Sequence, residues 1–327
     1  AQESRGLGDV YKRQGLMHAV YGRTFASLPI ILNIVQLVGW GTFELVVMRD
    51  ATVAIGQQSG AMAGAHWPVL ATLLWGGVVM LLISGSMVQL VRKLIARIAL
   101  PLVVLSLLWL SWQFLSLAQT QGFEALWTRK GDGGMGVLPA LDLVIAMPIS
   151  WLPLVADYAR HGKNGGSALR GTWLGYALAN IWCYSLGVLV ALTLPSQDLV
   201  QALLLAQGGL IALSLILIDE VDNAYGDAYS GAVSAHSLLP RWGVRAWGLL
   251  VAALCTGLAL VLPMHSLEPF LLLLSSVFVP LFGVILGRLA FGTDAPALLA
   301  TARKVNAVPV AIWLAGIAVY HLSLIHI

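Results

Sequence analysis

Charge is scarce in this sequence. Only 10% of its 327 residues are charged, whereas 59% are hydrophobic and the mean hydropathy is +0.85. Soluble domains carry about 25% charged residues, so a soluble globular protein is excluded. Apolar stretches of about 20 residues, without strict apolar–polar alternation, also exclude an outer-membrane β-barrel. The composition therefore predicts an all-α, multi-pass membrane protein.

Motifs of catalysis and cofactor binding are also lacking. The sequence has no Walker loop, HExxH, GxSxG or clustered Cys/His metal pattern, and the string GKNGGS (162–167) lacks phosphate-loop spacing. Its two cysteines, Cys183 and Cys255, fall inside apolar stretches, which is typical of buried hydrophobic residues. We expect no enzyme activity, cofactor, metal site or nucleic-acid partner, and infer no obligate protein partner beyond the lipid bilayer.

Windows of about 20 residues predict nine membrane-spanning helices. They cover roughly 27–48, 67–90, 95–118, 138–158, 172–194, 199–222, 244–263, 268–290 and 306–325.

The basic residues of the connecting loops are distributed unequally between the two sides. One side has only Arg49, Arg129 and Lys130. The other has Arg23, Arg92, Lys93, Arg97, Arg160, Lys163, Arg170, Arg241, Arg245, Arg288, Arg303 and Lys304. The positive-inside rule makes the richer side cytoplasmic. We expect the inner (plasma) membrane of a prokaryote, with the 199–222 helix running inward and its acids in the cytoplasmic half of the span.

The two ends differ from the rest of the chain. The first fourteen residues, AQESRGLGDVYKRQ, are polar, and the last six are LSLIHI. Both resemble translated sequencing-adaptor read-through, which is excluded from fold reasoning. We expect foreign tails at 1–14 and 322–327 around a single transmembrane domain at 15–321, an internal fragment of a longer protein.

The predicted 138–158 span contains two prolines in its middle, Pro148 and Pro153. Each proline removes a backbone donor and crowds the preceding turn. Broken helices at membrane depth line the substrate sites of many secondary transporters, although a simple proline kink is the alternative. Ser150 and Trp151, between the prolines, favour a binding site, because an indole offers a flat stacking surface and one donor.

The predicted 27–48 span carries a polar stripe on an otherwise apolar helix. Three- and four-residue steps place its members on one face, namely Asn33, Gln36, Trp40 and Glu44. Gly39 and Gly41 flank Trp40 and would allow close approach by a helix or a ligand. An acid near mid-span usually faces a cavity or a partner. The alternatives are helix packing for Trp40 and a snorkelling acid at the outer interface for Glu44.

A cluster of acids follows the apolar stretch around 199–218. Asp219, Asp222 and Asn223 project from one helix face, and Glu220 and Asp227 from an adjacent one. Crowded carboxylates can hold a proton or a cation, which is what a coupled transporter needs. The alternative is that the span ends near residue 218 and water solvates the acids.

Three strings together resemble the nucleobase–cation symporter family of cytosine permease, hydantoin transporters and hydroxymethylpyrimidine permeases. They are LPIILNIVQLVGWGTFEL, MPISWLPLVADYARHGK and DEVDNAYGDAYSGAVSAHSLLP. They look like that family's third, sixth and eighth helices, and the hydroxymethylpyrimidine branch looks closest. The resemblance implies an inverted-repeat (five-plus-five) fold of twelve helices. About nine would be present, without the first two and the last.

The resemblance also implies roles for individual residues. Trp40 and Trp151 would sandwich a flat heterocycle, with Ser150 beside the helix break and Glu44 hydrogen-bonding the ring. The remaining implied positions lie on the eighth helix, with Asp222 and Asn223 as substrate contacts and Asp219 and Glu220 near the coupling ion. That ion would be H⁺ or Na⁺, and sodium coupling is doubtful without the hydroxyl pair of sodium-coupled members.

These features predict a secondary active transporter that works by alternating access. It would import a pyrimidine-like nucleobase or thiamine precursor, such as cytosine or hydroxymethylpyrimidine, together with a cation. One alternative is an intramembrane enzyme that uses Asp219, Glu220 and Asp222. Others are an inverted-repeat symporter for a different small solute, or a channel, for which no repeated pore-lining filter is seen.

Overall fold

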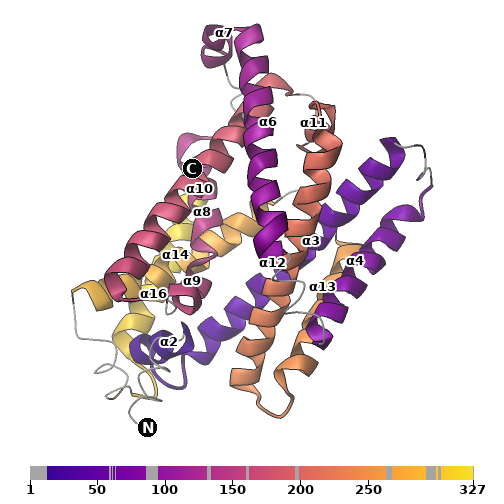
Figure 1. The fold of residues 1–327 in the computed structure, drawn as a ribbon. Helices are drawn as coiled ribbons and strands as arrows, with labels where there is room; N and C mark the ends of the chain where they lie inside the picture. Colours follow the sequence, from indigo (N-terminus) through magenta and orange to yellow (C-terminus); the bar gives the residue numbers. More distant parts are fainter. Residues whose placement is uncertain are drawn as a thin grey trace.

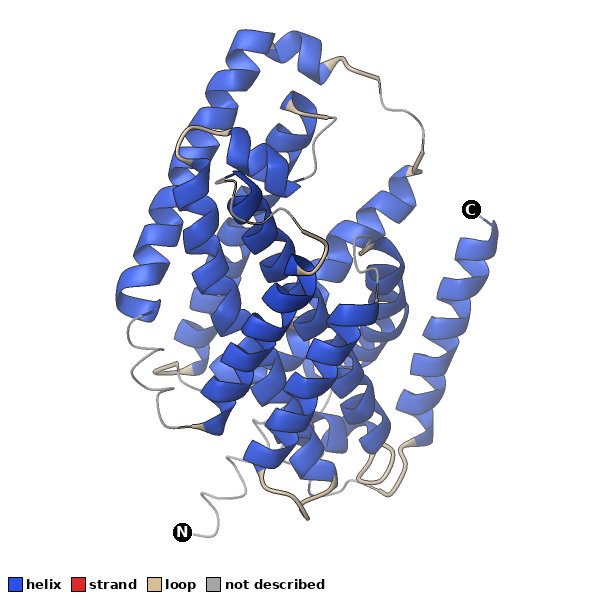
Figure 2. Cartoon of the chain, turned by 90° about the vertical axis from the view of Figure 1, so that its right-hand side faces the viewer, coloured by secondary structure: helices blue, strands red, loops and turns tan. Residues whose placement is uncertain are grey.

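A computed structural model describes residues 13–58, 60, 62, 64–85, 95–130, 134–159, 162–195, 199–262, 267–291, 300 and 303–326. These residues form helices and short connections, with no strand among them (Figure 2). Most of the expected tail at 1–14 lies outside the described residues, and α2 (Arg13–Tyr21) starts within its last two positions. At the other end, α16 (Ala307–His326) continues past residue 321.

Within the described residues, seven helices have the length and apolar composition to cross a membrane. They comprise α3 (Ser27–Gln58), α4 (Trp67–Ser84), α6 (Leu100–Gln121) with the π-helical turn η1 (Ile95–Ala99), α8 (Val137–Ile149) with α9 (Leu152–Ala159), α10 (Gly165–Thr193), α13 (Val244–Val261) and α14 (Glu268–Ala290). Together with α12 (Gly209–Leu238) and α16, they overlap the nine predicted spans. Two short helices remain, α7 (Phe123–Trp127) and α11 (Leu199–Leu205).

The helix lengths repeat along the chain. A helix of 32 residues, α3, is followed by one of 18, α4, and then by α6 with 22. The same order returns as α12 with 30 residues, α13 with 18 and α14 with 23. A 32-residue helix is about 48 Å long, so α3 must tilt strongly or project from a bilayer core of about 30 Å. This succession fits the expected inverted repeat.

The long helices α3 and α12 cross each other and form the centre of the molecule. α3, α4, α12 and α13 pack together on one side, while α8, α14, α16 and α2 lie on the other (Figure 1). A large apolar cluster fills the first group, and a smaller one around Phe278 and Trp313 fills the second. Asp142 of α8 accepts hydrogen bonds from Ser275 of α14 and Tyr320 of α16, which ties these helices together.

The predicted 199–222 span is wrong in its boundaries. α11 ends at Leu205, the chain turns, and α12 begins at Gly209. Gly208 has φ +74°, and a Cβ on Gly209 would lie 1.9 Å from the Leu203 carbonyl oxygen, so the turn requires glycines. A hydropathy window does not detect this turn, because the residues on both sides of it are apolar. The acids at 219–227 therefore lie in the middle of a 30-residue helix and not at the end of a span that stops at 222.

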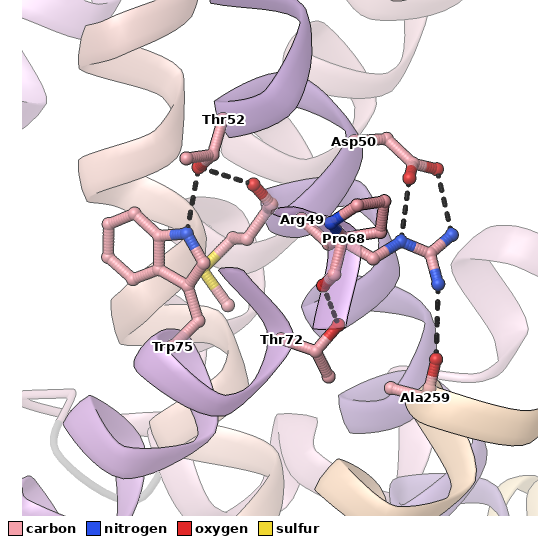
Figure 3. Close-up of polar contacts among 8 residues, drawn as sticks. Arg49, Asp50, Thr52, Pro68, Thr72, Trp75 and Ala259 are labelled. Carbon is pink, nitrogen blue, oxygen red and sulfur yellow. Dashed lines mark hydrogen bonds and ion pairs between the residues drawn. The ribbon is translucent and has the colours of Figure 1, made fainter. Parts of the chain in front are cut away.

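The assignment of Arg49 to an outer loop is also wrong, because Arg49 lies within α3. Its guanidinium donates to both carboxylate oxygens of Asp50, at 2.7 and 3.2 Å, and to the Ala259 carbonyl of α13 at 3.1 Å (Figure 3). Nearby, Trp75 of α4 donates to the Thr52 hydroxyl at 2.8 Å (Figure 3). These hydrogen bonds join α3 to α13 and to α4 in the half of α3 that follows Glu44.

Candidate functional site

Side chains bond several of the backbone carbonyls at the break between α8 and α9. Pro148 cannot donate to the Val144 carbonyl one turn earlier, and the Tyr184 hydroxyl of α10 donates to it instead at 2.9 Å. The Tyr176 hydroxyl likewise donates to the Pro148 carbonyl at 2.9 Å. The Ser150 hydroxyl bonds the Met147 carbonyl at 2.6 Å. Open backbone at this depth is thus stabilised by polar partners from within the protein.

Gln36 connects this break to the long helix α3. Its amide donates to the Ser150 carbonyl at 2.9 Å and to the Asn33 side chain at 3.1 Å. Asn33 continues the network by donating to the Ser234 hydroxyl of α12 at 3.3 Å. A cavity with room for about one water molecule lies beside Asn33, Ser234 and Pro153. The break, α3 and α12 therefore meet at one point.

Trp40 lies one turn beyond Gln36 on the same face of α3. Its ring packs edge-on against Phe270 of α14, with centroids 5.5 Å apart, and against Phe43 at 6.1 Å. The glycines on either side of Trp40 permit close approach of other helices, as the sequence led us to expect. A Cβ at Gly39 would lie 2.5 Å from the Phe270 ring, and one at Gly41 would lie 3.1 Å from Cys255 Sγ.

We expect Gly39→Ala to lower the stability of the protein in detergent. The added methyl group would overlap the Phe270 ring, and overpacking of this kind costs about 1–3 kcal/mol. The matched control is Gly257→Ala on α13, where a Cβ would meet nothing within 4 Å. Thermal unfolding of both variants checks this. Equal melting temperatures for Gly39→Ala and wild type would contradict the packing described.

A pair of carboxyl groups lies one further turn along α3. Glu44 and Asp227 of α12 are hydrogen-bonding neighbours, and Glu220 also interacts electrostatically with both. Both side chains of the pair are buried, at 9% and 7% exposed. Two adjacent buried carboxylates cannot both keep their charge without a counter-charge, so the pair must share a proton or bind a cation.

Four buried polar atoms have no hydrogen-bond partner among the described residues. They are Gln36 Oε1, Trp40 Nε1, Glu44 Oε2 and Asp227 Oδ2. Three belong to one stripe of α3, which covers about 12 Å of helix at 1.5 Å per residue. A buried polar group without a partner costs about 1–3 kcal/mol. Such groups therefore indicate a place that a polar ligand completes, with three acceptors and one donor.

The other residues singled out in the sequence take different positions. Ser150 is buried at the break, whereas Trp151 is 40% exposed. Asn223 is half-buried and hydrogen-bonds Glu220, and Asp219 is half-buried near Asp222. Glu220 therefore interacts both with the Glu44–Asp227 pair and with Asp219, and Asp219 also interacts with Asp222.

Sequence reasoning did not include Asp227, Gln36, Asn33 or Ser234 among the site residues. A signal existed for Asp227, because it follows Glu220 by seven residues and so shares its helix face. Gln36 and Asn33 belong to the polar stripe that was recognised. Ser234 had no distinguishing signal, since small residues are common on membrane helices.

Comparisons with known proteins support a transporter. A family model described as permease for cytosine/purines, uracil, thiamine, allantoin matches residues 14–326. A solved structure of similar fold is that of Mhp1, a nucleobase-cation-symport-1 family transporter in a closed conformation with bromovinylhydantoin bound. It has a TM-score of 0.66 and 16% identity, and the alignment covers 98% of this chain and 81% of that one. No curated protein sequence matched.

The family model confirms the prediction of a transporter, and the similarity to the Mhp1 structure confirms the prediction of an all-helical transporter fold. They leave the intramembrane-enzyme alternative without support, because the family model describes permeases. Since that model covers nearly the whole sequence, the chain belongs to the family of permeases for cytosine/purines, uracil, thiamine and allantoin.

Proposed function

We propose that the protein imports a pyrimidine-like nucleobase or a thiamine precursor, such as cytosine or hydroxymethylpyrimidine, by cation-coupled alternating access in the plasma membrane of a prokaryote. The observation that carries this proposal is the set of unpartnered buried polar atoms along α3 and α12, next to a broken helix. Flat heterocycles with several nitrogen donors suit such a set of acceptors. The single domain at 15–321 would supply these contacts as part of the longer transporter.

The ring would bind between Trp40 of α3 and Trp151 at the start of α9. Phe270 and Phe43 contact the Trp40 ring in T-shaped geometry, and the substrate ring would stack on the indole. Ser150 would lie beside the ring at the break, and Glu44 would accept its hydrogen bonds. On α12, Asp222 and Asn223 would add contacts as the bundle closes around the substrate.

Coupling to a cation would involve the acids of α12. Asp219 and Glu220 occupy adjacent positions near the middle of this helix, which contains no lysine or arginine. Binding of H⁺ or Na⁺ would neutralise part of this charge and favour one conformation over the other. Of these two acids, Glu220 is the one that interacts with Glu44. Binding of the ion near Glu220 would therefore change the affinity for substrate at Glu44, and the reverse.

We expect Asp219→Asn to change how uptake depends on pH or on sodium. Neutralising this carboxylate removes one of the charges that a coupling ion would balance. Initial uptake rates measured across a pH series, with and without sodium, check the expectation. Glu124→Gln in α7 is a suitable control, since it lies outside the acidic cluster. A pH and sodium profile identical to wild type would remove Asp219 from coupling.

Uptake by cells that express the complete gene product tests the function itself. Labelled cytosine and hydroxymethylpyrimidine should accumulate above the level of cells without the protein, and a cation ionophore should abolish the accumulation. Absence of uptake for every base tested, together with turnover of a lipid or peptide, would contradict the proposal.

A further inference from the structure

The segments that precede α3 and α16 are joined through their backbones. The amide of Arg23 donates to the Arg303 carbonyl at 2.9 Å. The amide of Thr24 donates to the Lys304 carbonyl at the same distance. Gly22, with φ +99°, permits this approach, because a Cβ there would lie 2.8 Å from the Lys304 carbonyl oxygen. Two segments from opposite ends of the chain are therefore held side by side.

Buried side chains anchor this backbone pairing to the helices around it. The Tyr21 hydroxyl of α2 donates to the Leu281 carbonyl of α14 at 2.7 Å. The Asn306 side-chain amide donates to the Val20 carbonyl at 2.9 Å. The Tyr21 ring lies 5.7 Å from the ring of Trp313 on α16, and α2 packs against both α14 and α16 (Figure 1). Since this anchoring resists separation of the two segments, the side chains that they carry stay close together.

The paired segments carry three exposed basic side chains, Arg23, Arg303 and Lys304, which we call the basic patch. No acidic residue occurs at 13–26 or at 303–306. Within the described part of the chain, none of the three forms an ion pair. Like charges on directly paired backbone segments repel each other and destabilise the pairing. An anion bound among the three side chains would offset this repulsion.

Exposed apolar side chains border the basic patch. Val305, directly after Lys304, is 46% exposed, and Val308 in the first turn of α16 is 67% exposed. Leu28 in the first turn of α3 is 40% exposed. A soluble anion would contact only the cations, whereas a phospholipid would place its phosphate among them and its acyl chains along the apolar side chains. The combination of charge and adjacent apolar surface favours a phospholipid over a soluble anion.

We propose that Arg23, Arg303 and Lys304 bind the headgroup of an anionic phospholipid, with its acyl chains against the apolar side chains at the starts of α3 and α16. The positive-inside rule predicts that this end of both helices faces the cytoplasm, so the lipid belongs to the cytoplasmic leaflet. Its phosphate holds together the segments that precede the two helices. The inference does not depend on which solute the protein carries.

Binding of phosphatidylglycerol to the purified full protein in uncharged detergent micelles, measured by native mass spectrometry, tests the proposal. Each basic side chain near an anionic lipid surface contributes about fivefold in affinity, so Arg303→Gln combined with Lys304→Gln should weaken binding about 30-fold. The matched control combines Lys163→Gln with Arg170→Gln. It removes two exposed charges from the same predicted side of the membrane, but from one continuous segment at the start of α10. The control should bind phosphatidylglycerol like wild type.

Two further probes distinguish a lipid headgroup from other partners. Phosphatidylcholine carries no net charge and inorganic phosphate carries no acyl chains, so both should bind wild type more weakly than phosphatidylglycerol does. Equal binding of phosphatidylcholine, displacement of phosphatidylglycerol by inorganic phosphate at the same concentration, or equal loss of affinity in the two double variants would contradict the proposal. The comparison of the three probes on wild type needs no variant, so the test does not depend on how the substituted proteins fold.

Discussion

Replacing Trp151 by alanine is expected to weaken binding of the transported base by roughly 5- to 150-fold. Stacking of a base on an aromatic side chain is worth about 1–3 kcal/mol, and Trp151 offers an indole directly at the break between α8 and α9. Its side chain is 40% exposed, so its removal should cost little packing. Binding of labelled base to purified protein gives the measurement.

The control for this prediction is Trp173→Ala. Trp173 lies on α10, outside the proposed site, and is more exposed than Trp151. Its removal should leave the dissociation constant within about twofold of wild type. Surface substitutions usually change free energies by no more than about 0.5 kcal/mol, which corresponds to a change of about twofold. An unchanged affinity in Trp151→Ala would show that the ring does not stack there.

Glu44→Gln is expected to abolish detectable uptake of the preferred base. The amide cannot share a proton with Asp227, and its NH2 group is a donor that opposes an amino group on the ring. Loss of a charge-assisted hydrogen bond costs about 1.5–3 kcal/mol, and an opposed donor adds to this. Initial uptake rates and binding constants should both be measured, so that loss of affinity is distinguished from loss of transport.

A matched variant is Glu124→Gln in α7, which makes the same chemical change outside the site. It should transport like wild type. If Glu44→Gln also retains wild-type affinity and the same preferred ring, the substrate cavity lies elsewhere.

The sequence predicted the features that depend on local chemistry. The polar stripe of α3 follows from the helical period, and Gln36, Trp40 and Glu44 do lie on one face. The helix break followed from Pro148 and Pro153, since proline cannot continue the backbone ladder. In each case the physical cause lies within a few residues of its effect.

The features that escaped prediction depend on contacts between distant segments. Tyr184 satisfies the Val144 carbonyl 40 residues earlier in the chain, and no local pattern indicates that bond. The pairing of Glu44 with Asp227 depends on how α3 crosses α12. The turn before Gly209 was hidden because hydropathy averages α11 and α12 into one apolar stretch.

A structure of the protein with its preferred base bound tests the central claim most directly. The account predicts that the ring lies between Trp40 and Trp151, with a polar group of the ring within hydrogen-bonding distance of Glu44. A ring bound instead beside Asn33 and Ser234, or in the region of Asp142, would contradict it.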